Sequence, residues 1–475
     1  MNLTPMVIDG QPVTTAEASD IRSPFDDRLV GSVPKCGPAE IDRAVTAAAA
    51  RLTEPLPTHE RAMVLDRAAV ALTERAEEFA RGICDEAAKP IRTARVEVER
   101  AADTFRFAAA VARTLAGEVI PLDASAAGAG KLGFTLRVPI GVVAAVTPFN
   151  FPLNLVAHKV APAIAAGCPA VVKPASATPL TALRLAELLE RDAGLPAGWL
   201  NVVTCDGHTA DHLVTHPDVA MVTFTGSATV GWGIKARAPR KHVNLELGNN
   251  APLIVDTGVD VDDVARRVAL AANGFAGQSC ISVQRVYVLH EIEHEFTAAL
   301  AAATDALVVG NPAEEATDVS ALITPADTTR VLTTVTDAVD AGARVLCGGT
   351  VLDLGTHGVL APTVLTNVER HMAVSATEVF GPVVGVRACA TIDEAINRAN
   401  DTAYGLQAGI FTNDLRTGLE AAQRLRFGGV TVNEVPTWRA DQMPYGGVGE
   451  SGNTKEGPGW AVRDMTVERM VIIGN

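Results

Sequence analysis

Short apolar segments rich in β-branched residues alternate with helix-forming segments along almost the whole chain. This alternation limits the possible folds more than any other feature of the sequence. It is typical of βαβ units, which build parallel sheets covered by helices. Helices are predicted in this first part at 178–193 and 208–214. The strands expected around them read VVAAVTPF, AVVKPAS, LNVVT, MVTFTGS and APLIVD.

A second series of the same kind follows, and we expect it to form a second α/β domain, with the divide near Leu247–Asn250. Helices are predicted here at 291–305, 326–341 and 391–400. The strands of this series read RVYVL, LITP, ARVLCGG, VLAPTVLTNV, VVGVRACA and GLQAGIFT.

Three segments depart from this alternation. Residues 40–116 repeat apolar positions at intervals of three and four, which predicts packed amphipathic helices. The Gly/Ala-rich segment 123–141 and the apolar segment 465–475 could each form a hairpin that stands off the body. An exposed apolar strand is an aggregation hazard unless it is paired, so we expect a homo-oligomer to cover it.

Composition excludes several classes of protein. The chain of 475 residues is 48% apolar and 20% charged, as in globular proteins that split into domains. Its start reads as a strand and turn rather than a secretory signal, and its apolar runs stop short of about 18 clean residues. A net charge of −15 without a basic stripe disfavours nucleic acid. We therefore expect a cytoplasmic protein that binds neither membrane nor nucleic acid.

The seven cysteines are odd in number, widely spaced and free of any CxxC pair. This pattern favours a reducing compartment over a disulfide framework, and it predicts no metal site. Most cysteines in such a chain fill space in the core. Cys280, in GFAGQSCISVQR, differs because small residues precede it and allow the backbone to pack closely around a reactive sulfur. From this segment alone, a nucleophile and a core residue are equally good readings.

Two further residues suit the chemistry of a nucleophilic cysteine. Asn150 lies between two prolines in TPFNFPLN, where a stiffly held amide could donate to an oxyanion, although a turn-forming Asn is an equal alternative. Glu246 ends an otherwise buried strand in HVNLELGNNAP. A desolvated carboxylate there would be a good general base, whereas the alternative is a strand-end Glu that faces water.

Three turns suit a nucleotide. VVKPAS presents Lys173 at the carboxyl end of a strand, where α/β sheets bind ligands. FTGSATVG places Gly226 and Ser227 at a helix N-terminus, which suits a phosphate, although it matches neither GxGxxG nor the Walker A loop. Glu378 in EVFGPV could accept both hydroxyls of a ribose, although a loop Glu is the commoner case.

Taken together and in this order, these segments resemble the aldehyde dehydrogenase superfamily. The motifs are PFNFP, VVKPAS, FTGS, LELG, GQSC, EVFGPV and MPYGGVGESG, and the resemblance runs from about residue 5 to the C-terminus. The segments ELGNNAP, GQSCISVQR and TWRADQMPYGG most resemble those of the lactaldehyde-dehydrogenase-like subgroup.

The resemblance implies a fold of two Rossmann-like α/β domains with a small β oligomerisation flap, in a homodimer or homotetramer. The expected limits are 1–119 and 139–247 for the cofactor-binding domain, 248–448 for the catalytic domain, and 120–138 and 449–475 for the flap.

The resemblance also assigns catalytic roles. Cys280 would attack the aldehyde to give a thiohemiacetal, while the Asn150 amide and the Cys280 N–H hold the oxyanion. Hydride transfer to NAD or NADP would leave a thioester, which water activated by Glu246 would hydrolyse to a carboxylic acid.

The resemblance assigns the cofactor residues too. Lys173 and Glu378 would bind the two riboses, and Gly226 and Ser227 the pyrophosphate. Thr147, Phe149 and Phe380 would line the cleft.

Two departures from the family pattern matter. Asn249 replaces the family's second Gly after Glu-Leu-Gly, which changes the local backbone but keeps the base. Ser176 stands where NAD-specific members carry a Glu that would repel a 2′-phosphate, so the choice between NAD and NADP stays open, with Lys173 as a phosphate partner.

The substrate is expected to be lactaldehyde or another small aldehyde. Arg100 and Arg439 are expected at the substrate funnel, with Arg285 as a weaker candidate. Two guanidiniums there would favour a phosphate, phosphonate, sulfonate or carboxylate group. The alternative is that they are surface or intersubunit arginines, and Asp441 could neutralise Arg439.

Three alternatives to a hydrolysing dehydrogenase fit the sequence less well. A CoA-acylating enzyme would typically lack Glu246. A non-catalytic protein that keeps the fold would have lost Cys280, Asn150 or Glu246. A cysteine hydrolase without a cofactor would need a His partner for Cys280, and none is evident.

Overall fold

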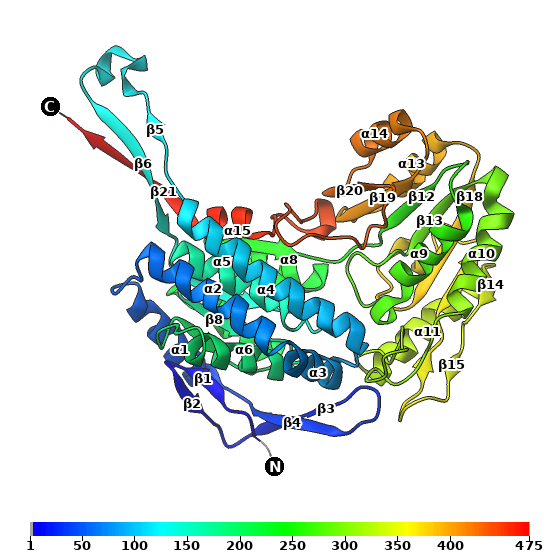
Figure 1. Ribbon diagram of the computed structural model, residues 1–475, viewed down its shortest axis with the longest axis horizontal. Helices are drawn as coiled ribbons and strands as arrows, with labels where there is room; N and C mark the ends of the chain where they lie inside the picture. The colour runs from blue at the N-terminus through cyan, green and yellow to red at the C-terminus, as the bar shows by residue number, and fades with distance from the viewer. Residues whose placement is uncertain (1–2, 475) are drawn as a thin grey trace.

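The computed structural model describes residues 3–474, which form two α/β lobes and a projecting three-stranded sheet (Figure 1). The N-terminal lobe is built on a seven-stranded sheet in which the central strands are parallel and the N-terminal hairpin adds two antiparallel strands. Its strands in spatial order are β11 (His242–Glu246), β10 (Val219–Thr225), β7 (Val142–Val146), β8 (Ala170–Lys173), β9 (Leu200–Val202), β1 (Met6–Ile8) and β2 (Gln11–Val13).

Helices cover both faces of this sheet because successive strand residues point to opposite sides. Val143 and Ala145 of β7 pack into one hydrophobic cluster, whereas Val142 and Ala144 pack into the other. The first cluster includes residues of α2 (Thr58–Glu74), α3 (Ala76–Ala87), α4 (Ile91–Thr114), α5 (Asn154–Ala166), α6 (Leu180–Arg191) and α15 (Pro458–Asp464). The second includes residues of α1 (Pro38–Arg51), α7 (Gly207–Thr215) and α8 (Ala228–Arg237).

The other lobe repeats this plan around a second seven-stranded sheet. Leu253 of its central strand packs on one face and Ile254 on the other. The strands in spatial order are β14 (Arg344–Cys347), β17 (Thr363–Thr366), β18 (Val383–Cys389), β13 (Arg285–Leu289), β12 (Pro252–Val255), β19 (Gln407–Phe411) and β20 (Gly429–Val432). One face packs on α9 (Val261–Asn273) and α10 (Glu293–Asp305), and the other on α13 (Ile392–Asn400) and α14 (Leu415–Arg424).

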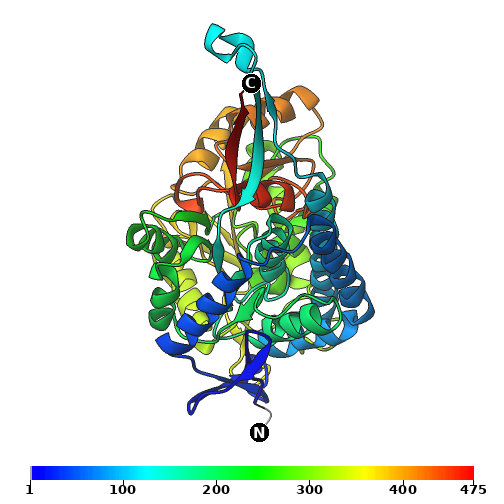
Figure 2. The ribbon, with the colours of Figure 1, turned by 90° about the vertical axis from the view of Figure 1, so that its left-hand side faces the viewer.

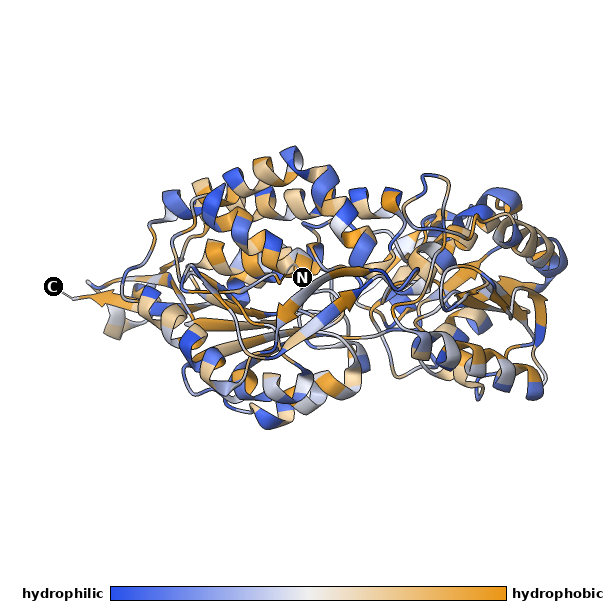
Figure 3. Ribbon diagram, turned by 90° about the horizontal axis from the view of Figure 1, so that it is seen from below, coloured by the Kyte–Doolittle hydropathy of each residue, from blue (hydrophilic) through white to orange (hydrophobic). Residues whose placement is uncertain are grey.

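A smaller cluster continues this core beside β17. It includes residues of α11 (Pro325–Asp340) and α12 (Ala373–Ala376), close to the two-stranded sheet of β15 (Val351–Leu352) and β16 (Val359–Leu360). Apolar strands therefore lie between helices whose outer faces are polar, as Figure 3 shows.

A three-stranded sheet projects from the N-terminal lobe and carries the C-terminal end of the chain (Figures 1 and 2). The strands β5 (Val119–Ile120), β6 (Leu132–Pro139) and β21 (Thr466–Ile473) are antiparallel. The expected apolar strand at the chain end is thus paired with β6 of the same chain. We call β5, β6 and β21 the flap. A further hairpin, β3 (Ala18–Arg22) with β4 (Leu29–Pro34), lies near the N-terminus.

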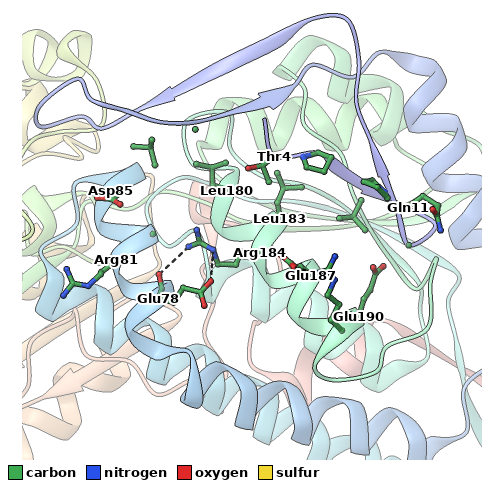
Figure 4. Close-up of a pocket in the computed structure, with 18 residues that line it drawn as sticks. Thr4, Gln11, Glu78, Arg81, Asp85, Leu180, Leu183, Arg184, Glu187 and Glu190 are labelled. Atoms are coloured by element: carbon green, nitrogen blue, oxygen red, sulfur yellow. Dashed lines mark hydrogen bonds and ion pairs between the residues drawn. The ribbon is translucent and has the colours of Figure 1, made fainter. Parts of the chain in front are cut away.

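A cavity of about 650 Å³ lies under the N-terminal hairpin, against α3 and α6 (Figure 4). Two ion pairs lie within its lining: Arg184 is 3.3 Å from Glu78, and Arg191 is 2.7 Å from Glu187. Neither a cysteine nor a histidine is among its lining residues. The chemistry of the protein must therefore be sought elsewhere.

Most predicted elements are present, and two strands are corrected. Residues 322–325 are not a strand: the Ile323 N–H donates to the Gln278 side chain at 2.9 Å, and Thr324 caps α11. The segment VLAPTVLTNV is not continuous, because Ala361 and Pro362 separate β16 from β17. Within residues 3–474, no helix is both long and apolar enough to span a membrane.

Candidate active site

The predicted site residues of the N-terminal lobe gather at one edge of its sheet. Strands β7, β8, β10 and β11 are parallel, so their carboxyl ends meet at that edge. Lys173 and Glu246 end two of these strands, and Thr147 and Gly226 follow the other two directly. The connection from Leu247 to Ala251 then leads into β12 of the second lobe.

The segment before Cys280 has an unusual backbone. Phe275, Ala276 and Gly277 all adopt positive φ values, of 51°, 51° and 67°. A Cβ at residue 277 would lie only 2.1 Å from the Gly381 carbonyl oxygen, so only glycine fits there. Such strain persists where the surrounding structure enforces it, and it is common at functional sites. It presents Cys280 between the two lobes.

Cys280 lines a cavity of about 220 Å³ together with Glu246, Arg100, Arg439 and Tyr445. Its Sγ lies 2.9 Å from the Tyr445 hydroxyl oxygen. Burial raises the pKa of the thiol to about 12, although the Tyr445 hydrogen bond acts in the opposite direction. The thiol is therefore protonated at neutral pH in this state, and it needs a base or an added positive charge to react.

Asn150 is buried in the short loop between β7 and α5, two residues after Pro148. Its Nδ2 donates to the Gln278 carbonyl oxygen at 2.9 Å, and its Oδ1 has no hydrogen-bond partner. The first contact ties the Asn150 amide to the loop that carries Cys280. Its second N–H is left to donate to an oxyanion there.

Glu246 has a side chain suited to a general base. It is only 3% exposed, and within residues 3–474 neither of its carboxyl oxygens has a hydrogen-bond partner. Burial raises its pKa well above the usual value, and the nearby charge of Glu456 adds to this shift. Because both oxygens are free and the residue lines the Cys280 cavity, it can accept a proton from a water molecule or from the thiol.

A buried ion pair supports this loop region. Lys89 and Glu97 contact each other with both side chains inaccessible, and Lys89 Nζ donates to the Asn150 carbonyl at 2.6 Å. Glu97 in turn accepts the N–H groups of Leu153 and Asn154 at the start of α5. The Lys89 ammonium also lies 3.8 Å from the centre of the Phe151 ring. This pair fixes the main chain on both sides of the Asn150–Pro152 turn.

Arg100 and Arg439 both reach the cavity, and each holds a different carboxylate. Arg100 binds Asp441 through two hydrogen bonds of 2.9 and 3.1 Å. Arg439 lies 3.0 Å from Glu456, and its Nε has no partner. Asp441 thus pairs directly with Arg100, which α4 brings from a distant part of the chain, while its charge also raises the pKa of Arg439.

A neutral histidine connects these two pairs. His158 Nε2 lies 2.8 Å from Asp441 and 3.1 Å from Arg439. Burial lowers its pKa, and the charge of Arg439 lowers it further. Lys159 contributes a further cation, 3.3 Å from Glu456. Three cations, Arg100, Arg439 and Lys159, thus face three carboxylates in this cluster: Asp441, Glu456 and Glu246.

Arg285 does not join them, although it was the third substrate candidate. Its guanidinium is buried at the start of β13, where it donates to the carbonyls of Asn250 and Ala399. It also contacts the Tyr287 hydroxyl at 3.1 Å. Its side chain points into the core, and Arg285 is not among the residues that line the Cys280 cavity.

Lys173 and Ser176 lie at one end of the same sheet edge. Lys173 is 7% exposed, burial lowers its pKa, and no carboxylate in the described chain forms a salt bridge with it. Ser176 donates to the Cys205 carbonyl at 3.1 Å and lines a cavity of about 550 Å³ with Glu40 and Asp206. Gly226 and Ser227 precede α8, and the Ser227 side chain does not cap this helix.

Glu378 and two aromatic rings lie between the lobes. Glu378 accepts the Asn249 N–H at 2.9 Å, and burial raises its pKa to about 7. The rings of Phe149 and Phe380 meet edge to face at 5.8 Å. Asn249 also donates to the Gln407 carbonyl at 3.1 Å, so the departure from glycine adds a link to β19.

Sequence reasoning missed Tyr445, Glu456 and His158. Tyr445 lies within the quoted MPYGG motif, but nothing in the sequence places its hydroxyl beside Cys280. Glu456 and His158 contact residues that are distant in the sequence, so no local pattern could have identified them.

Comparison with known proteins assigns a family to this fold and site. The profile of the aldehyde dehydrogenase family matches residues 13–471. The chain belongs to the aldehyde dehydrogenase family, which confirms the α/β fold and the reaction class expected from its motifs.

Within the family, two relatives are informative. A 3-sulfolactaldehyde dehydrogenase from Priestia aryabhattai is 43% identical over 469 residues, which cover 98% of this chain and 97% of the relative. A lactaldehyde dehydrogenase from Methanococcus vannielii is 36% identical over 476 residues, 99% of this chain and 100% of the relative. The expected likeness to lactaldehyde dehydrogenases is confirmed.

Solved structures agree. Aldehyde dehydrogenase 21 from Physcomitrella patens, in complex with the reaction product succinate, has a TM-score of 0.95 at 38% identity and covers 100% of this chain and 98% of its own. An NADP-dependent glyceraldehyde-3-phosphate dehydrogenase from Bacillus halodurans, complexed with NADP, has a TM-score of 0.95 at 34% identity, with 100% and 99% covered. NAD-dependent and NADP-dependent enzymes both share this fold.

Proposed function

We propose that this protein oxidises a small anionic aldehyde to a carboxylic acid, with NAD or NADP as the oxidant, Cys280 as the nucleophile and Glu246 as the general base. The observation that carries this proposal is a single cavity of about 220 Å³ lined by Cys280, Glu246, Arg100 and Arg439. A nucleophile, a base and two cations in one enclosed space suit attack on a carbonyl that carries a negative group.

The chain's own residues account for the covalent steps. Glu246 takes the Cys280 proton, and the sulfur then bonds to the carbonyl carbon, while Asn150 Nδ2 and the Cys280 N–H donate to the oxygen. Glu246 then releases this proton to solvent. When the aldehyde carbon is later at the oxidation level of a thioester, the ionised Glu246 removes a proton from water as the water attacks that carbon. The carbon–sulfur bond breaks, and the acid is released. Transfer of the acyl group to water needs a base for the water proton, and the free carboxyl oxygens of Glu246 supply it.

The cofactor residues fit a dinucleotide. Lys173 offers an ammonium without a salt-bridge partner in residues 3–474, beside the cavity that Ser176 lines. Lys173 and Glu378 would hold the two riboses, Gly226 and Ser227 the pyrophosphate, and Thr147, Phe149 and Phe380 the walls of the cleft. When bound, NAD or NADP accepts the hydride that leaves the aldehyde carbon. Ser176 lacks the charge that would repel a 2′-phosphate, so either cofactor is compatible.

Two lines of support favour an anionic substrate. Both guanidiniums that line the cavity can form charge-assisted hydrogen bonds to an anionic group of the substrate. In addition, one of the two relatives named above is a 3-sulfolactaldehyde dehydrogenase, and the Physcomitrella patens enzyme is in complex with succinate. A sulfonate or carboxylate on a carbon close to the aldehyde therefore suits the site.

The test compares aldehydes that differ by one anionic group. Cofactor reduction is measured with 3-sulfolactaldehyde against lactaldehyde and with succinic semialdehyde against butanal, each with NAD and with NADP. We expect the wild type to prefer the anionic member of each pair. Arg100→Met should lower the anionic-to-neutral ratio of kcat/KM by about 10- to 100-fold, the value of a charge-assisted hydrogen bond.

The matched control is Arg106→Met, which removes a guanidinium from the exposed side of the same helix and should leave the ratio unchanged. Cys280→Ala should abolish reduction of the cofactor. If no aldehyde reduces either cofactor, the proposed function is wrong. If neutral and anionic aldehydes react equally well, the reaction stands and the anionic substrate does not.

The flap supports the proposed homodimer or homotetramer. Its strands expose Leu132, Leu136, Met470, Ile472 and Ile473, and one edge of β21 has no strand beside it in the described chain. Apolar strands of this kind are normally covered by a partner. Light scattering should show an oligomer, and Ile472→Lys should shift it toward monomer. We also propose the domain limits given above and a cytoplasmic location. The location is supported by the seven cysteines, which are all free.

A further inference from the structure

The hydroxyl of Tyr445 contacts the sulfur on which the proposed reaction depends. Its oxygen lies 2.9 Å from Cys280 Sγ, within hydrogen-bond distance, in a partly buried setting. In the described chain this is the one hydrogen bond that the Cys280 side chain makes. The residue therefore touches a reacting atom, and it has no role in the function proposed above.

Three contacts hold this tyrosine in place. The Arg439 guanidinium lies 3.8 Å from the centre of its ring, and Arg439 is itself held by Glu456 at 3.0 Å. The main chain of Tyr445 pairs with that of Glu456 as an isolated antiparallel bridge, with the Tyr445 N–H donating at 3.2 Å. Tyr445, Arg439 and Glu456 thus form a closed ring of contacts that aims the hydroxyl at the sulfur.

The geometry points to Tyr445 as a further catalytic residue, whose hydroxyl donates a hydrogen bond to the Cys280 thiolate and favours its formation. This inference rests on Cys280 being the nucleophile of the proposed function. The proton stays on the tyrosine oxygen throughout; the thiol loses its own proton to a base, and the hydroxyl then donates to the anionic sulfur. No further reactant is needed.

The acidities of the two groups agree with this assignment. Burial raises the pKa of Tyr445 well above its usual value, and the neighbouring Cys280 raises it further. Burial also raises the pKa of Cys280, and the Tyr445 hydrogen bond is the largest influence that lowers it. The shared hydrogen bond thus favours ionisation of the sulfur over ionisation of the tyrosine. The positive charge of Arg439 over the ring makes the hydroxyl a better donor.

The test is a titration of Cys280 in the full-length protein without substrate or cofactor. Thiolate absorbance at 240 nm is followed against pH, and the signal of Cys280→Ala is subtracted. Tyr445→Phe keeps the ring beneath Arg439 and removes only the hydroxyl. We expect the thiol pKa to rise by one unit or more in Tyr445→Phe.

A second readout is the rate of Cys280 alkylation by iodoacetamide at fixed pH, located by peptide mass spectrometry. The thiolate fraction falls about tenfold per pKa unit, but a more basic thiolate is intrinsically more reactive, so the net rate falls about threefold per unit. Tyr287→Phe is the matched control: it removes a buried tyrosine hydroxyl that donates to the Arg398 carbonyl in the second lobe, and it should change neither readout.

The sign of the shift separates the two possible roles of Tyr445. If its hydroxyl only fills space, Tyr445→Phe admits water, lessens the burial of the sulfur and lowers the thiol pKa. An unchanged or lowered pKa would therefore overturn the proposal. A second variant replaces Tyr445 by 3-fluorotyrosine, which is a stronger donor of nearly the same shape and should leave the protein folded. It should lower the pKa of the Cys280 thiol. The proposed function fails separately, if Cys280→Ala still oxidises aldehydes.

Discussion

The carboxyl group of Glu246 ionises under the influence of Glu456, a second buried carboxylate in the same cavity. Burial raises the pKa of Glu246, and the charge of Glu456 raises it further. Glu456 itself stays ionised: burial opposes this, but Lys159 and Arg439 lower its pKa to about 2. The pKa values of the two groups are thus moved in opposite directions, although both are nearly inaccessible. In the proposed function, Glu246 is the base, and Glu456 sets its strength.

The first prediction follows from this pair. A base with a raised pKa loses activity as the pH falls through that pKa, because only its ionised form accepts a proton. Glu456→Gln removes the repelling charge, so the pKa of Glu246 should fall. The acid limb of thioester hydrolysis should move to lower pH by about one unit, a gain of about tenfold in rate at a fixed acidic pH.

The measurement is the single-turnover hydrolysis of an acyl group placed on Cys280 with an activated ester, so that the cofactor plays no part. Glu187→Gln, a change of charge on exposed α6, serves as control and should leave the profile unchanged. A limb that stays in place or moves to higher pH would show that Glu246 is not the base, or that Glu456 does not act on it.

The second prediction concerns the buried pair of Lys89 and Glu97. Lys89→Met leaves the Glu97 carboxylate buried without its counter-ion, and removes the donor to the Asn150 carbonyl. Loss of one partner of a buried pair typically costs about 3–5 kcal/mol. The free energy of unfolding in urea should therefore fall by that amount. Arg191→Met breaks an exposed pair with Glu187 and should have no measurable effect.

Equal losses in Lys89→Met and Arg191→Met would contradict this view of the buried pair. A double variant, Lys89→Met with Glu97→Leu, should recover part of the stability, because no charge is then left unpaired. Activity should not recover with it, since the Asn150 carbonyl remains without its donor.

Much of the fold and of the reacting residues could be predicted because the signal is local. Cys280, Glu246 and Asn150 lie in motifs whose neighbours restrict the backbone, and the uninterrupted apolar run of β7 is typical of a strand buried on both faces. Ion-pair partners could not be predicted in this way. Asp441 lies two residues from Arg439 in the chain, yet it binds Arg100, which α4 brings from 341 residues away. Nor could the sequence show that the strand of Arg285 turns its guanidinium into the core rather than toward the substrate funnel.

The third prediction tests the strained segment before Cys280. Gly277 has φ of 67°, and an added Cβ would lie 2.1 Å from the Gly381 carbonyl oxygen. Gly277→Ala should therefore combine backbone strain with a clash, at a cost of about 3 kcal/mol in the free energy of unfolding. Gly274→Ala is the matched control three residues earlier, where nothing lies within 4 Å of the added methyl group. It should change stability by less than about 0.5 kcal/mol.

The two glycine variants should also differ in reactivity. Gly277→Ala displaces the loop that positions Cys280, so its alkylation rate should change while that of Gly274→Ala does not. If both variants unfold at the wild-type urea concentration, the positive φ at Gly277 is not required by the fold.

The last prediction concerns the choice between NAD and NADP. Ser176 lines the cavity next to Lys173, and its hydroxyl binds the Cys205 carbonyl rather than any charged group. Ser176→Glu would place a carboxylate near the ribose that Lys173 is proposed to bind. This charge would repel a 2′-phosphate and accept a hydrogen bond from a 2′-hydroxyl, so KM for NADP should rise at least about tenfold more than KM for NAD, a difference of about 1.4 kcal/mol. Thr333→Glu adds the same charge to exposed α11 and controls for net charge. If Ser176→Glu raises both KM values equally, the 2′-position of the cofactor lies elsewhere, and Lys173 has no part in the selection of the cofactor.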